Sequence, residues 1–333
     1  MTMYKVVVLS PLPEGLVRMF FAEYLEKYSL EAEFVCLPFG TGKEELERNL
    51  EDADIVIGDY TMRVKLTSGI IEHMKKVKLV AQPSTGYDHI DIAACREKGI
   101  PVSNVGGANS VSVAEHTIAL ALALMRRITY ANNSVLEGKW VQDDLMNTTY
   151  ELSGKIWGIV GMGRIGREVA FRACNMGSKI IYYDINKMKA EEEAKYSASP
   201  EPFSRLLAIS DVVSVHIPLN DSTRGMFGEK EFRTMRPSSI FINVSRGGLV
   251  DENALARALM EGWIAGAGID VFSSEPPDVS NPIIVAAKAG ANIILTPHIA
   301  GATNDSRIRI IQTTVENVVR VMLGQKPENV VNP

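Results

Sequence analysis

Residues 155–184 read KIWGIVGMGRIGREVAFRACNMGSKIIYYD, and this stretch decides the fold of the chain. It begins with an apolar run of strand type, which is followed at once by three glycines in the spacing G-x-G-x-x-G: Gly161, Gly163 and Gly166. A helical pattern then extends to Asn175, and a second strand-like run ends at Asp184. A strand, a glycine turn, a helix, a second strand and a terminal acid within about 30 residues predict a dinucleotide-binding unit.

Each part of this unit has a physical reason. Gly161 allows the tight turn, Gly163 lets a pyrophosphate approach the backbone, and Gly166 lets the helix pack close to the strand. The helix N-terminus offers free N–H groups and a positive dipole end to phosphates. Asp184 lies 184 − 163 = 21 residues after the middle glycine. There a carboxylate can accept hydrogen bonds from ribose hydroxyls and repel a 2′-phosphate, which predicts NAD(H) rather than NADP(H).

The composition is typical of a globular protein with two domains. The chain has 333 residues, of which 46% are apolar and 23% charged, and this length exceeds one ordinary core. The net charge of −5 without a basic block gives no reason to expect nucleic-acid binding. No apolar run approaches the about 20 residues that span a bilayer, so no membrane association is expected. No metal-ligand spacing is present, and three widely spaced cysteines predict a reducing, cytoplasmic location: Cys36, Cys95 and Cys174.

Strand-like runs alternate with helical ones along the chain, which predicts an α/β protein with two doubly wound parallel sheets. Five strands are expected in the first series: Lys5–Leu9, Ala32–Leu37, Ile55–Gly58, Leu79–Gln82 and Pro101–Val105. Six are expected in the second: Ile156–Val160, Ile180–Tyr183, Val212–Ile217, Ile240–Val244, Ala265–Val271 and Ile293–Thr296. The apolar helix Ala114–Arg127 between the two series suits a subunit interface, with a plain buried helix as the alternative. A last helix is expected at Asn304–Leu323.

The segments that follow the predicted strands carry the candidate chemistry, because ligands of open α/β sheets bind beyond the carboxyl ends of the strands. In the second series these segments contain two histidines, an arginine and two acids, at His216–Pro218, Ser245–Gly248, Asp270, Glu275 and Pro297–Gly301. In the first series the fourth strand is followed by Ser84–Asp88. An arginine, an acid and a histidine are thus expected at the edge where a nicotinamide would bind.

These groups fit the reduction of a 2-keto acid, which needs a hydride, a proton and a cation for the carboxylate. Histidine is the side chain best suited to exchange a proton at neutral pH, so His298 can donate the proton, while Glu275 orients its ring and stabilises the charged form. Arg246 offers a planar fork for the carboxylate and can polarise the carbonyl. Backbone N–H groups around Thr85 and Gly86 can bind the other side of the carboxylate as a nest. His116 and His216 are expected to be structural and pocket-shaping residues, respectively.

Six sequence blocks identify a family resemblance. They are STGYDHID at Ser84–Asp91, NSVSVAEHTIAL at Asn109–Leu120, GIVGMGRIGREVA at Gly158–Ala170, NVSRGGLVDENAL at Asn243–Leu255, GAGIDVFSSEPP at Gly266–Pro277 and TPHIAGAT at Thr296–Thr303. With these blocks the chain resembles the D-isomer-specific 2-hydroxyacid dehydrogenase family over its whole length. In that family the arginine, glutamate and histidine at the positions of Arg246, Glu275 and His298 form the catalytic set.

The resemblance also implies a cofactor site and a domain plan. It implies NAD contacts at Thr85, Arg164, Ile165, Asp184, Ile217, Val244, Ser245, Arg246, Asp270, His298 and Gly301, to which the glycine turn and Pro218 are added. A flavodoxin-like substrate domain is expected at 1–104 plus 299–333, with a Rossmann cofactor domain inserted at 105–298. Dimerisation is expected through the Asn109–Arg127 region.

The activity expected from the resemblance is an NAD(H)-dependent reduction of a small 2-keto acid such as glyoxylate or hydroxypyruvate. D-3-phosphoglycerate dehydrogenase is the alternative, although Asp59 stands where that branch usually has an arginine and would repel a phosphate; Arg63 or Lys65 could compensate. A formate dehydrogenase would pair its histidine with glutamine rather than with Glu275. An NAD-sensing co-repressor remains a further alternative, and a panel of keto acids would separate these functions.

Overall fold

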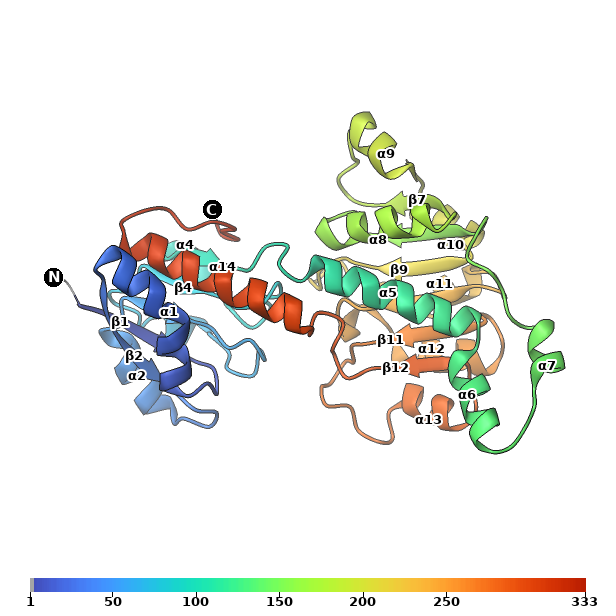
Figure 1. Cartoon of the computed structure of the whole chain (residues 1–333), viewed down its shortest axis with the longest axis horizontal. Helices are drawn as coiled ribbons and strands as arrows, with labels where there is room; N and C mark the ends of the chain where they lie inside the picture. The colour runs from blue at the N-terminus through green and yellow to red at the C-terminus, as the bar shows by residue number, and fades with distance from the viewer. Residues whose placement is uncertain (1–2) are drawn as a thin grey trace. The chain divides into compact units, whose positions relative to one another are not determined.

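The computed structural model describes residues 3–333, which divide into two compact units (Figure 1). The chain up to Asn109 together with Asn304–Pro333 forms one unit, here called the discontinuous unit. Ser110–Thr303 forms the other, here called the central unit. The sequence placed the two domain borders after residues 104 and 298, whereas the chain changes unit after residues 109 and 303.

The discontinuous unit is a five-stranded parallel sheet in the order β2-β1-β3-β4-β5, which is the flavodoxin-like order. Its strands are β1 (Met3–Val8), β2 (Glu31–Cys36), β3 (Ile55–Ile57), β4 (Leu79–Ala81) and β5 (Val102–Ser103). Its helices are α1 (Glu14–Tyr28), α2 (Lys43–Glu51), α3 (Ser68–Ile71), α4 (Ile92–Glu97) and α14 (Asn304–Met322).

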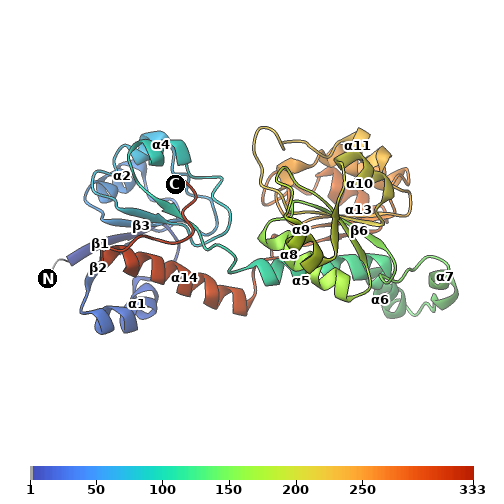
Figure 2. The same cartoon turned by 90° about the horizontal axis from the view of Figure 1, so that it is seen from above.

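Helices cover both faces of this sheet (Figure 2). Val6 and Val8 of β1 pack with α1 and α14 on one face, whereas Val7 packs with α2, α3 and α4 on the other. Successive side chains of a strand point to opposite faces, so a strand buried on both sides reads as a continuous apolar run. The run KVVVL at residues 5–9 is such a case.

The central unit is a seven-stranded parallel sheet in the order β12-β11-β10-β9-β6-β7-β8. Its strands are β6 (Ile156–Val160), β7 (Lys179–Tyr183), β8 (Ala198–Pro200), β9 (Val212–Val215), β10 (Ile240–Asn243), β11 (Gly266–Ile269) and β12 (Ile293–Leu295). The order reverses at β6, next to the glycine turn, so this turn lies at the topological switch point where dinucleotides bind. The predicted fold class, two doubly wound parallel sheets with a Rossmann unit, is confirmed.

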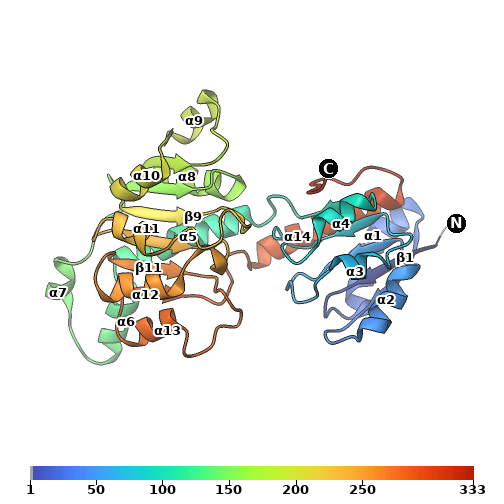
Figure 3. The same ribbon diagram turned by 180° about the vertical axis from the view of Figure 1, so that it is seen from behind.

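Helices again form two layers around the central sheet (Figure 3). One layer contains α5 (Ser110–Met125) and α8 (Arg164–Asn175), and the other contains α10 (Phe203–Ile209), α11 (Glu229–Thr234), α12 (Glu252–Met260) and α13 (Pro282–Lys288). The remaining helical segments are α6 (Ile128–Leu136), α7 (Gln142–Met146), α9 (Ala190–Tyr196) and the 3₁₀ turn Gly247–Leu249. Within residues 3–333, no helix combines the length and apolar character needed to cross a membrane.

One strand was missed by the sequence prediction, and one predicted helix is largely buried within its own unit. Strand β8 was missed because its three residues, Ala198–Pro200, form a short edge strand. The strand contains a proline and no run of β-branched or aromatic residues. The apolar helix predicted at Ala114–Arg127 is α5, and it buries much of its surface against α8, β10 and β11 of its own unit. Its hydrophobicity is therefore largely explained by the core of the central unit.

Candidate active site

The three glycines of the turn after β6 have three different geometries. Gly161 adopts φ +99°, a conformation that side chains disfavour, and its N–H donates to the carbonyl of Tyr183 at 2.8 Å. A Cβ at Gly166 would collide with the carbonyl oxygen of Gly161, so the missing side chain lets α8 approach the turn. A Cβ at Gly163 would meet no atom within 4 Å. The backbone at Gly163 is therefore open to a ligand, as a pyrophosphate site requires.

Asp184 lies at the end of β7 and contacts the glycine turn. Its Oδ2 accepts a hydrogen bond from the N–H of Met162 at 2.7 Å, and its Oδ1 accepts one from Asn186 at 2.8 Å. The carboxylate is half-buried, and each oxygen has a second lone pair that can accept from a ribose hydroxyl. The turn and Asp184 thus fit the dinucleotide for which the sequence predicts them.

The end of β9 carries a neutral histidine. Burial lowers the pKa of His216 to about 3, and its Nε2 lies 2.9 Å from Oγ of Ser214. Ser245, which follows β10, donates its hydroxyl to the carbonyl of Val215 at 2.7 Å. The bond from Ser245 connects the ends of β10 and β9, whereas the contact of His216 lies within the end of β9. That His216 shapes the pocket without reacting stays a prediction.

Arg246 is held at the end of β10 by an asparagine. Asn243 accepts from the N–H of Ser245 at 3.0 Å and donates to the carbonyl of Arg246 at 2.9 Å. A Cβ at the next residue, Gly247, would collide with the backbone of Phe272. This close approach brings the segment after β10 against the segment after β11, which carries Glu275.

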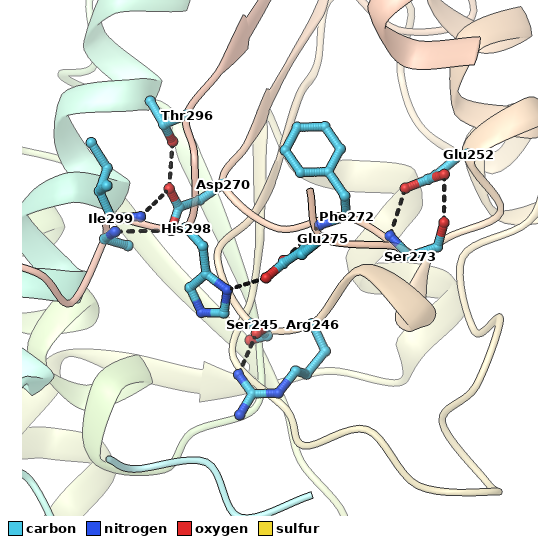
Figure 4. A network of polar contacts seen from close by, with 11 residues as sticks. Ser245, Arg246, Glu252, Asp270, Phe272, Ser273, Glu275, Thr296, His298 and Ile299 are labelled. Atoms are coloured by element: carbon cyan, nitrogen blue, oxygen red, sulfur yellow. Dashed lines mark hydrogen bonds and ion pairs between the residues drawn. The ribbon is translucent and has the colours of Figure 1, made fainter. Parts of the chain in front are cut away.

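Glu275 and His298 form a hydrogen-bonded pair, and Arg246 lies in the same group of side chains (Figure 4). Oε2 of Glu275 is 2.6 Å from Nδ1 of His298, and Oε1 accepts from the N–H of Phe272 at 3.0 Å. Burial raises the pKa of Glu275, but the bonds from His298 and Phe272 and the charges of His298 and Arg246 outweigh it and hold this pKa below its ordinary value. Both side chains are about one-third exposed, at 36% and 34%, so a small molecule can reach them.

Asp270 holds the turn that carries His298. Its buried carboxylate accepts from the hydroxyl of Thr296 at 2.5 Å and from the N–H groups of Ile299 at 2.9 Å and Ala300 at 2.8 Å. Its carbonyl accepts from the N–H of His298 at 2.8 Å. His298 itself has φ +55°, which is strained for a residue with a side chain. The sequence suggested Asp270 only as a cofactor contact, so this clamping role is visible only in the structure.

His116 of α5 lies beside this clamp. Its Nε2 is 3.1 Å from Oγ1 of Thr296 and 3.7 Å from Oδ1 of Asp270. Burial lowers its pKa, and the charge of Asp270 opposes that shift. The sequence analysis treated His116 as structural; its place in the block that begins at Asn109 was the only signal that it approaches the site.

In the discontinuous unit, the Ser84–Tyr87 loop presents free backbone donors. The carbonyls of Ser84, Thr85 and Gly86 accept from Val105 N–H at 3.5 Å, Asn104 Nδ2 at 2.9 Å and Ser84 Oγ at 2.7 Å, respectively. Among residues 3–333, no acceptor binds the N–H groups of Thr85, Gly86 or Tyr87. Thr85 also donates its hydroxyl to Oδ1 of Asn109 at 2.7 Å.

The other predicted cofactor contacts belong to the central unit. Arg164 and Ile165 begin α8, directly after the glycine turn, and the rest follow strand ends: Ile217, Pro218, Val244, Ser245 and Gly301. The central unit therefore holds the predicted catalytic set and the predicted cofactor residues other than Thr85. Thr85 and Gly86 lie in the discontinuous unit.

The chain matches one family model and is similar to known enzymes in sequence and in structure. Residues 118–300 match the model of "D-isomer specific 2-hydroxyacid dehydrogenase, NAD binding domain". The glyoxylate reductase of Thermococcus litoralis is 38% identical, covering 98% of this chain and 96% of its own. The D-3-phosphoglycerate dehydrogenase of Archaeoglobus fulgidus is 36% identical over 98% of this chain, which spans only 59% of that protein. A crystal structure of D-lactate dehydrogenase from Aquifex aeolicus, complexed with NAD and lactic acid, superposes with a TM-score of 0.83 at 30% identity, covering 98% of this chain and 99% of that one.

Proposed function

As a member of the D-isomer-specific 2-hydroxyacid dehydrogenase family, the chain is an NAD-dependent oxidoreductase acting on the CH–OH group of 2-hydroxy acids, and we propose that it reduces glyoxylate or hydroxypyruvate with His298 as proton donor. The observation that carries the proposal is the 2.6 Å bond between Glu275 and His298 in the group that also contains Arg246. A titratable ring, an acid that orients it and a cation are the protein groups that this reaction needs.

The proposed mechanism assigns one task to each side chain. The glycine turn and Asp184 would hold NADH, which would supply the hydride for the carbonyl carbon. Glu275 binds Nδ1 of His298, which leaves Nε2 to deliver a proton to the carbonyl oxygen. The low pKa of Glu275 keeps it ionised at neutral pH, so it favours the imidazolium before transfer. Arg246 binds the carboxylate in its planar fork and polarises the carbonyl.

In the discontinuous unit, backbone donors for a carboxylate are proposed at the Ser84–Tyr87 loop. Three successive N–H groups without an acceptor in the described chain, at Thr85, Gly86 and Tyr87, can receive an anion as a backbone nest. The discontinuous unit is accordingly the proposed substrate domain, and the central unit the proposed cofactor domain. The predicted NAD contacts given above belong to the same proposal.

Asp59 supports a substrate without a phosphate. It is fully buried after β3, and its carboxylate accepts from Thr61, Arg63 and Val64 N–H at 2.8–3.1 Å. A buried negative charge at this strand end disfavours a second anionic group on the substrate. The identity to the A. fulgidus enzyme supports D-3-phosphoglycerate dehydrogenase as the second candidate.

A homodimer is part of the proposal. The predicted interface Asn109–Arg127 is followed by a segment with exposed apolar side chains: Ile128, Tyr130, Val135, Leu136, Trp140, Met146 and Tyr150. Such side chains on consecutive elements are typical of an interface. Light scattering after size-exclusion chromatography would show twice the mass of the 36.5 kDa chain; a monomer would contradict this part.

The activity is tested by following NADH oxidation with glyoxylate, hydroxypyruvate, pyruvate and phosphohydroxypyruvate. The highest kcat/KM is expected for glyoxylate or hydroxypyruvate. A preference for phosphohydroxypyruvate would favour the second candidate. Tight NADH binding without turnover of any keto acid would contradict the enzymatic role of the site.

A further inference from the structure

Gln82 occupies a buried position between two loops of the discontinuous unit. It follows β4 directly, is 1% exposed, and donates its backbone N–H to the carbonyl of Ser103 at 2.7 Å. A Cβ at Gly58 would collide with Oε1 of Gln82, so a glycine at the end of β3 makes room for this side chain. Neither residue belongs to the glycine turn or to the catalytic set.

The side-chain amide of Gln82 begins a relay that ends at the proposed anion nest. Its Nε2 donates to the carbonyl of Asp59 at 3.0 Å and to Oγ of Ser84 at 2.7 Å. Ser84 in turn donates its hydroxyl to the carbonyl of Gly86 at 2.7 Å. The direction is set by chemistry: the Asp59 carbonyl can only accept, so the NH₂ group must face it. With Nε2 donating to Ser84 as well, the single hydroxyl hydrogen is directed to Gly86.

The relay orients the donors that the substrate would meet. In a trans peptide the C=O and the following N–H point in opposite directions. Because the carbonyl of Gly86 points towards the hydroxyl of Ser84, the N–H of Tyr87 points away from that hydroxyl. Together with Asn104, which binds the carbonyl of Thr85, the relay occupies carbonyls and leaves N–H groups available.

The side-chain amide of Gln82 also lowers the stability of the fold, which favours a functional reason for its presence. Oε1 of Gln82 is buried and has no hydrogen-bond donor among residues 3–333. A buried acceptor without a partner destabilises a fold, and such groups are concentrated where another requirement outweighs stability. A methionine would fill similar space without an unpaired polar atom.

We propose that Gln82 is a positioning residue that, through Ser84, holds the Thr85–Tyr87 nest in the conformation that binds the carboxylate of the keto acid. This inference rests on the proposed function, because it assigns the nest to that substrate. Gln82 touches neither the keto acid nor NADH in this scheme. Its loss should consequently weaken substrate binding rather than the chemical step.

The test compares Gln82→Met, which removes the two donors, with Gln82→Glu, which would accept from Ser84 and reverse the relay. For Gln82→Met we expect KM for the keto acid to rise about tenfold with kcat within about twofold, as for loss of binding shared by ground and transition state. Gln82→Glu should raise KM further. Binding of oxamate to the NADH complex, followed by NADH fluorescence, should weaken in parallel, whereas the Kd of NADH should not change.

Ser84→Ala provides a second variant in case Gln82 variants do not fold, and it should also raise KM. Because both residues act in one relay, the double variant should raise KM little more than Gln82→Met does. A pair that only supports the fold would lower the free energy of unfolding without raising KM. Asn317→Leu is the matched control: it replaces another buried amide of the same unit, one that accepts from Glu328 N–H at 2.7 Å, and should leave KM unchanged.

An unchanged KM and unchanged oxamate binding in folded Gln82→Met and Ser84→Ala would overturn the positioning role. Wild-type protein that reduces no keto acid would instead overturn the proposed function. The two failures are distinguished by the wild-type assay alone.

Discussion

Two loops that leave parallel strands are held by opposite kinds of buried side chain. In the central unit, the carboxylate of Asp270 gathers N–H groups of the turn that carries His298. In the discontinuous unit, the amide of Gln82 donates to the carbonyl of Asp59 and to the hydroxyl of Ser84, and that hydroxyl donates to the carbonyl of Gly86 in the loop that precedes Tyr87. A carboxylate accepts hydrogen bonds and so occupies backbone N–H groups, whereas an amide NH₂ or a hydroxyl donates and so occupies backbone carbonyls.

This difference determines which groups of each loop remain available to a ligand. The N–H groups of the Asp270-clamped turn are occupied, so a side chain, His298, is left to act. The carbonyls of the Gln82-held loop are occupied, so its free N–H groups can receive an anion. We therefore expect changes in the first loop to appear in kcat and changes in the second to appear in KM.

The largest effect is expected for His298→Ala. Loss of the proton donor should lower kcat about 10³-fold, since general acid catalysis contributes about 10²–10⁴-fold. NADH titration should show that cofactor binding is largely kept. His73→Ala, which removes a histidine from an ion-pair cluster in the other unit, is the control and should remain active. Retention of wild-type kcat by His298→Ala would show that another group donates the proton.

Asp270→Asn should have the next largest effect, because an amide cannot accept all three bonds that the carboxylate accepts. The strained φ of His298 would then relax, and a small misplacement of a catalytic group can lower kcat about 10²-fold. Asp251→Asn is a matched control in the same unit, since that carboxylate also binds backbone N–H groups, those of Asn253 and Ala254. Equal kinetics for the two variants would contradict a special role of the clamp.

Glu275→Gln should lower the rate of reduction. Because the pKa of Glu275 is held below its ordinary value, the wild-type side chain is ionised throughout the neutral range. The variant keeps an oxygen that can accept from Nδ1 of His298 but loses the negative charge that favours the imidazolium. The kcat for keto acid reduction at pH 7 should therefore fall about tenfold, which corresponds to about 1.4 kcal/mol. A kcat equal to that of the wild type would show that Glu275 does not stabilise the imidazolium.

His216→Asn should have the smallest effect on catalysis but a measurable one on stability. The pKa of His216 is lowered to about 3 in the folded state, against about 6.5 when unfolded. Between these values the unfolded chain binds the extra proton, so stability falls as pH falls, by at most about 1.4 kcal/mol per pH unit. Denaturant unfolding at pH 4 to 7 should show a shallower pH dependence in the variant. An unchanged slope would mean that His216 is accessible to protons in the folded state.

Local pattern was sufficient for much of the fold. The runs that became β1 and β6 are apolar because parallel strands are buried on both faces, and the glycine spacing reports a backbone requirement directly. Strand β8 was missed because its three residues, including Pro200, owe their conformation to the edge of a sheet built by others. Arg246, Glu275 and His298 could be placed at one edge because strand ends of a parallel sheet converge there.

The sequence by itself determined the two doubly wound sheets, the glycine turn proposed to bind NAD(H) and the candidate catalytic set, because each depends on residue type at a short spacing. Only the tertiary structure decided how the loops are held. Asp270 and Thr296, or Gln82 and Asp59, are separated in sequence and meet only when their strands pair. A hydrogen bond between distant residues has no periodic signature in a chain, since it depends on packing rather than on local conformation.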